Sequence, residues 1–143
     1  LFIICSLILY NLGFAVFALS VCIFSDIGGY VIGKIIGGKK LTKISPNKTV
    51  SGSVGSFIFS LIPFLILYLG FEQFINTKFL ILIIFSLLIS LVSQLGDLFI
   101  SLLKRKAKVK DTGYFLPGHG GLLDRVDGII FALPFTTILL FTL

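Results

Sequence analysis

Four long apolar runs constrain the fold of this chain more than any other feature. They cover residues 1–25, 54–71, 79–103 and 129–143 and carry few or no charges. A helix needs roughly 20 apolar residues to cross a bilayer. We therefore predict an all-α, polytopic membrane helix bundle with about four transmembrane helices. The last run is the shortest, which predicts either a short helix or one that continues beyond residue 143.

The chain is expected to form a single membrane-embedded domain over residues 1–143. It begins inside an apolar run without a Met, which predicts that it is the C-terminal part of a longer protein. Cys5 and Cys22 are too far apart on one helix to pair, so both are expected to be packing residues. Small residues at 52, 53, 55 and 56 predict close helix approach in lipid.

Basic residues are confined almost entirely to two connections between the runs. Of the 12 Lys and Arg residues, all except Lys78 lie between the first and second runs or between the third and fourth. Basic loops favour the cytoplasmic side, so we predict two cytoplasmic loops, which four helices would place on one side. The net charge of +6 is then explained by topology and contact with the lipid bilayer. No nucleic-acid partner is expected.

A polar stripe runs along the third apolar segment. Each member is linked to another by a step of three or four residues, which places them on one helical face. They are Ser86, Ser90, Ser93, Gln94, Asp97, Ser101 and Lys104. This face should point into the bundle or a wet cavity. An Asp at membrane depth is costly and indicates function, although Asp97 could instead form a structural ion pair with Lys104 or Arg105.

Residues 101–127, SLLKRKAKVKDTGYFLPGHGGLLDRVD, concentrate charge beside the membrane. Together with Asp97, its carboxylates at Asp124 and Asp127 offer hard oxygen ligands that suit Mg²⁺ and a phosphate. The glycines around His119 would let backbone N–H groups approach an anion. His119 could contact a phosphate, transfer a proton or only order the loop. Asp124 could instead cap a helix, and Asp127 could act as a cap or pair with Arg125.

This segment resembles the signature of the phosphatidate cytidylyltransferases (CDP-diacylglycerol synthases). The fixed positions of that signature are filled here by Ser101, Lys104, Arg105, Lys110, Asp111, His119, Gly120, Gly121, Asp124, Arg125 and Asp127. Upstream, QLGDL at 94–98, Asp26, Tyr30 and SPNKT at 45–49 resemble further family segments. Two positions depart from the pattern: Gly29 stands where Ala is usual, and Ser51 stands where Glu is usual.

The resemblance implies that CMP is transferred from CTP to phosphatidic acid, giving CDP-diacylglycerol and pyrophosphate, with Mg²⁺ as cofactor. It implies Asp97 and Asp124 as metal ligands. Phosphates would be handled by Ser101, Lys104, Arg105, Lys110 and Arg125. The nucleotide side would be shaped by Asp26, Lys34, Ser45 and Lys48. The rest of the expected site is Asp111, His119, Gly120, Gly121 and Asp127. The expected location is a bacterial inner (plasma) membrane, with the active site facing the cytoplasm.

Two alternatives remain open at this stage. A related CTP-dependent membrane-lipid cytidylyltransferase or kinase would keep the fold and change the lipid. An ion-coupled transporter could use Asp97 as its ion site, which explains the polar stripe but not the matching loop residues. The oligomeric state is also open, a homodimer being one arrangement, and so is activity, because an inactive copy would share the same pattern.

Overall fold

The computed structural model describes residues 12–42, 44–70, 79–108 and 123–141, with side chains of the last range described for 127–139. This part of the chain is built from α2 (Leu12–Ile36), α3 (Val50–Gly70), α4 (Phe79–Lys106) and α5 (Leu123–Phe141). Three of these helices, α2, α3 and α4, are long and apolar enough to cross a membrane. The apolar section of α5, Asp127–Leu139, is shorter. The predicted all-α membrane bundle is confirmed.

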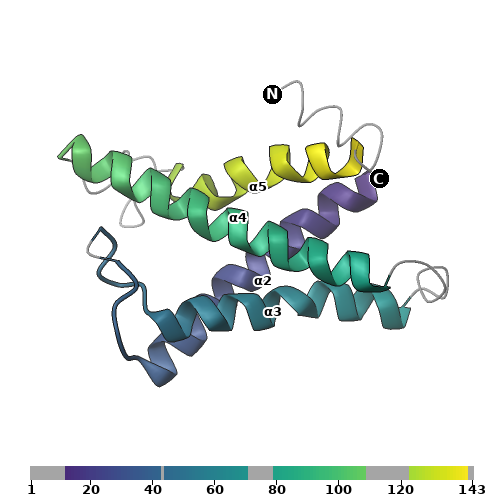
Figure 1. The fold of residues 1–143 in the computed structure, drawn as a ribbon, viewed down its shortest axis with the longest axis horizontal. Coiled ribbons are helices and arrows are strands. Elements are labelled where there is room, and N and C mark those ends of the chain that lie inside the picture. Colours follow the sequence, from purple (N-terminus) through teal and green to yellow (C-terminus); the bar gives the residue numbers. More distant parts are fainter. Residues whose placement is uncertain (1–11, 43, 71–78, 109–122, 142–143) are drawn as a thin grey trace.

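Successive helices run in opposite directions (Figure 1). α3 begins, α4 ends and α5 begins at the same end of the bundle, on the left of the view. The loop that joins α2 to α3 lies at that end too. The chain therefore enters and leaves both basic connections at one end of the bundle, as the charge distribution predicted.

The first described helix ends further along the chain than the first predicted run. The run ends at residue 25, whereas α2 continues to Ile36. It ends where Gly37 and Gly38 take positive φ values of 63° and 104°, a backbone conformation that glycine adopts without strain. The next helix begins at Val50, earlier than predicted, and its Gly52 N–H donates to Thr49 Oγ1 at 3.1 Å, as in an N-cap.

The continuation of α2 is explained by its contact with α3. A Cβ added at Gly28 would lie 2.5 Å from Phe59 Cβ and 2.6 Å from the carbonyl oxygen of Gly55. A Cβ added at Gly55 would in turn lie 2.5 Å from Ile32 Cβ. Helices in lipid associate through such close packing of small residues, so glycines that suggest a loop here serve a helix–helix interface. The predicted close approach at 52–56 is confirmed.

The interior of the bundle combines an apolar core with the predicted polar stripe. Phe17, Val21, Phe64 and Ile89 belong to a buried cluster that also includes Cys22, as expected; Cys5 lies outside the described residues. The stripe hydroxyls of Ser86, Ser90 and Ser93 are buried, which confirms that this face of α4 points inward. α5 packs closely on the same helix: a Cβ added at Gly96 would lie 2.7 Å from the Phe131 ring, and one at Gly128 would lie 2.5 Å from Ser93 Oγ.

Candidate active site

A cavity of about 320 Å³ opens at the end of the bundle where α3 begins. Its walls come from α2, α3, α4 and the loop between α2 and α3. The polar side chains that line it include Asp26, Ser45, Asn47, Lys48, Gln94 and Asp97. Three of the nucleotide-side residues expected from the sequence, Asp26, Ser45 and Lys48, are thus brought to the same cavity as Asp97.

The loop that carries Lys48 is held by hydrogen bonds within its own backbone and by one from the Arg105 side chain. Leu41 N–H donates to the Lys48 carbonyl at 2.8 Å, and Lys48 N–H donates to the Ser45 carbonyl at 3.1 Å. An isolated antiparallel bridge joins Lys40 to Thr49. Arg105 Nε, near the end of α4, donates to the Ile44 carbonyl at 3.4 Å. These contacts fold the loop over the ends of α3 and α4, so that Lys48 points towards α4.

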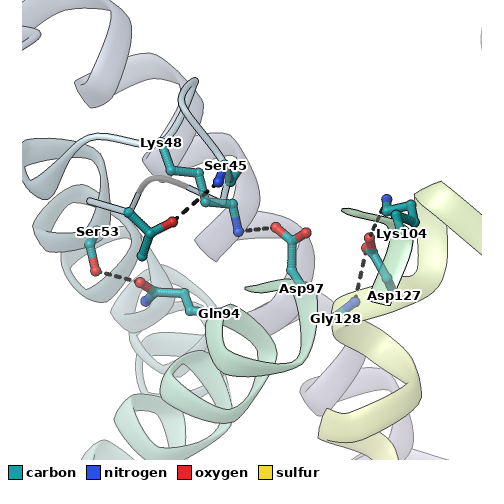
Figure 2. A network of polar contacts seen from close by, with 9 residues as sticks. Ser45, Lys48, Ser53, Gln94, Asp97, Lys104, Asp127 and Gly128 are labelled. Carbon is teal, nitrogen blue, oxygen red and sulfur yellow. Dashed lines mark hydrogen bonds and ion pairs between the residues drawn. The ribbon is translucent and has the colours of Figure 1, made fainter. Parts of the chain in front are cut away.

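Lys48 and Asp97 form an ion pair at the cavity (Figure 2). Both side chains are about 70% buried, with exposed fractions of 28% and 29%. The pair joins residues 49 positions apart and connects the loop to the polar stripe of α4. The sequence left open a structural ion pair of Asp97 with Lys104 or Arg105. The structure instead pairs Asp97 with Lys48.

A second ion pair lies on the α5 side of Asp97. Lys104 Nζ lies 3.7 Å from Asp127 Oδ2, and the two side chains are only 14% and 11% exposed. Asp127 Oδ1 also accepts the N–H of Gly128 at 3.1 Å (Figure 2). Asp97 is near enough to Asp26 and Asp127 for its negative charge to repel both carboxylates. Asp97 thus stands between the loop half and the α5 half of the site.

The whole chain, residues 1–143, matches the model of the cytidylyltransferase family. The chain belongs to this family. It is 46% identical over 131 residues to the phosphatidate cytidylyltransferase of Staphylococcus saprophyticus, covering 91% of this chain and 50% of that protein. It is 44% identical over 132 residues to the phosphatidate cytidylyltransferase of Bacillus subtilis, covering 92% and 48%. The chain spans about half the length of the curated relatives it matches.

The carboxylates of this cytidylyltransferase-family chain suit a divalent cation. Among the described residues, no group of three or more His, Cys, Asp and Glu side chains is placed to hold a metal ion. Mg²⁺, however, is commonly bound by one or two carboxylates with phosphates and water. Asp97 on α4 and Asp127 on α5 form such a pair of hard oxygen donors, so the donor chemistry fits. Asp124 lies one turn before Asp127 in α5, and its role as a ligand stays a prediction.

The remaining predicted site residues either lie on helices without lining the cavity or fall outside the described part of the chain. Ser101 is half-buried on α4. Lys34 is exposed and lies over the ring of Tyr30, 5.6 Å from its centroid, and it is not among the residues that line the cavity. The residues outside the described part of the chain are Lys110, Asp111, His119, Gly120 and Gly121, together with the side chains of Asp124 and Arg125.

Sequence reasoning missed some of the cavity wall. Asn47 lies inside the SPNKT segment, and Ser53 lies in the small-residue stretch that begins α3; both line the cavity. The position of Asn47 beside Lys48 was an available signal, since adjacent loop residues share a surface. Ser53 gave no such signal, because small residues at the start of a membrane helix indicate packing first.

Proposed function

We propose that the protein carrying this chain transfers CMP from CTP to phosphatidic acid, giving CDP-diacylglycerol and pyrophosphate. The observation that carries this proposal is the cavity in which Lys48 of a basic loop meets Asp97 of a membrane helix. In the proposed reaction this cavity would take the nucleotide from water and the lipid headgroup from the bilayer. The names of the relatives, phosphatidate cytidylyltransferase, support the same reaction.

In the proposed reaction an oxygen of the phosphatidate phosphate attacks the α-phosphorus of CTP. The bond from that phosphorus to the bridging oxygen of the β-phosphate breaks, and pyrophosphate leaves with the electron pair. Little covalent chemistry falls to the protein in phosphoryl-type transfers, where positioning and charge neutralisation dominate. Lys48 and Lys104 are cations at the two sides of Asp97 and would neutralise phosphate oxygens of the two substrates.

Mg²⁺ is the proposed cofactor, and it would supply neutralisation of the phosphate charge. Asp97 and Asp127 are the described carboxylates that would hold it, with Asp124 as the further candidate on α5. The proposed location is the inner membrane of a bacterial cell. The site would lie on the cytoplasmic side, because cytoplasmic loops carry the excess of Lys and Arg.

The proposal is tested by measuring pyrophosphate release from the complete protein in mixed detergent–lipid micelles. We expect release only when CTP, phosphatidate and Mg²⁺ are all present. Replacing phosphatidate with diacylglycerol or a polyprenyl phosphate, or CTP with UTP, provides the controls. If release needs CTP but is equally fast with another lipid, phosphatidate is not the specific substrate and this part of the proposal is wrong. Loss of the CTP requirement would refute the proposal.

A further inference from the structure

A chain of hydrogen bonds crosses the bundle directly beside the cavity. Ser25 Oγ of α2 and Ser90 Oγ of α4 are 2.8 Å apart and share a hydrogen bond. Gln94 Nε2 donates to Ser90 Oγ at 3.2 Å, and Ser53 Oγ of α3 donates to Gln94 Oε1 at 2.5 Å. This polar chain, Ser25–Ser90–Gln94–Ser53, joins three helices through uncharged side chains.

Gln94 lies in the middle of this polar chain. Its amide accepts a hydrogen bond from Ser53 of α3 and donates one to Ser90, so it pairs with a hydroxyl on each side. Ser25 and Ser90 are fully buried, each with 0% exposure. In an apolar surrounding without water, leaving such groups unpaired is costly. The polar chain therefore favours one rotation of α4 about its axis over its neighbours.

Asp97 shares the face of α4 that this rotation sets. It lies three residues after Gln94, about 4.5 Å further along the axis at 1.5 Å per residue, and both side chains line the cavity. Figure 2 shows Ser53, Gln94, Asp97 and Lys48 along one side of the site. On the other side of α4, Gly96 is seated against Phe131 of α5. The segment around Asp97 is thus held from α3 and from α5.

We propose that Gln94 is a positioning residue, which aims Asp97 at Lys48 and the substrates by fixing α4 against α3. The inference rests on the proposed function, since it assigns Gln94 a part in that reaction. A misplacement of about 1 Å in a reacting group can lower a rate about a hundredfold. Loss of the Gln94 contacts should therefore lower kcat much more than it changes KM for CTP, because Lys48 and the loop stay in place.

The test compares variants of the complete protein by steady-state kinetics per mole of folded enzyme. Gln94→Leu should lower kcat about a hundredfold and change KM for CTP less than about threefold. Ser53→Ala, a milder change at the other end of the same bond, should lower kcat about tenfold, and Ser53→Thr should restore it because the hydroxyl is kept. Ser20→Ala is the matched control, since the hydrogen bond of Ser20 Oγ within the described part of the chain stays inside α2, to the Val16 carbonyl at 2.6 Å.

The two positions should also act as a unit. Adding Ser53→Ala to Gln94→Leu should lower kcat no further, because the shared bond is already lost. The positioning role would be overturned if the two reductions in kcat multiply in the double variant. It would also be overturned if Ser53→Ala lowers thermal stability but leaves kcat unchanged. Failure of the proposed function would look different: the unsubstituted protein itself would then show no release dependent on both CTP and phosphatidate.

Discussion

Gly28→Ala should loosen the interface between α2 and α3 and lower the stability of the bundle. The added Cβ would lie 2.5 Å from Phe59 Cβ and 2.6 Å from the Gly55 carbonyl oxygen. Both atoms are fixed to helix backbones, so neither can move away by a side-chain rotation. The helices must instead separate or shift, which is overpacking of a kind that costs about 1–3 kcal/mol.

Part of this cost is offset by helix propensity. Ala is favoured over Gly in a helix interior by about 0.5–1 kcal/mol. The net loss expected for Gly28→Ala is therefore about 0–2.5 kcal/mol, with a midpoint of about 1 kcal/mol. At about 2–4 °C per kcal/mol for chains of 150–250 residues, thermal unfolding in detergent should shift down by several degrees.

Gly13→Ala is the matched control for this prediction. Gly13 lies in the same helix, and a Cβ added there would meet no atom of the described residues within 4 Å. Its unfolding temperature should stay unchanged or rise slightly, since only the propensity effect remains. Equal unfolding temperatures for the two variants would refute the close-packing account of α2 and α3.

Two further predictions concern the ends of the helices. Thr49→Ala should cost about 1 kcal/mol of stability through loss of the cap on the Gly52 N–H, and Thr49→Ser should recover it; equal thermal unfolding of the two variants would contradict this. Lys104→Met should cost about 1–3 kcal/mol because it leaves the mostly buried carboxylate of Asp127 without this cation. Lys106→Met, at an exposed position on the same helix end, should cost little, and a loss equal to that of Lys104→Met would show that the ion pair contributes nothing.

The helices and their directions could be predicted from hydrophobicity and charge because lipid imposes both. Apolar run length determines the spans, and the confinement of Lys and Arg to two connections places those connections at one end. The inward face of α4 followed from the three- and four-residue steps between Ser86 and Lys104. The extent of α2 did not follow, since Gly28, Gly29 and Gly33 have the composition of a loop and become helical through contact with α3.

The pairing inside the site could not be predicted from spacing. Lys104 is near Asp97 in sequence and on the same helix face, which made it, with Arg105, the partner in the structural alternative for Asp97. The structure instead gives Asp97 a partner from the loop before α3 and gives Lys104 a partner on α5. Ion pairs between distant segments depend on how the loop folds over the helix ends, and the bridge between Lys40 and Thr49 that sets this fold has no local sequence signal.

We propose that Asp97, paired with Lys48, is the carboxylate around which the reaction is organised. This proposal is tested most directly by Asp97→Asn in the complete protein, which keeps the side-chain shape and removes its charge. The measurement is pyrophosphate release dependent on both CTP and phosphatidate, together with membrane insertion of the variant. We predict normal insertion and a loss of turnover of about a hundredfold or more. Near-normal turnover in Asp97→Asn would contradict the account.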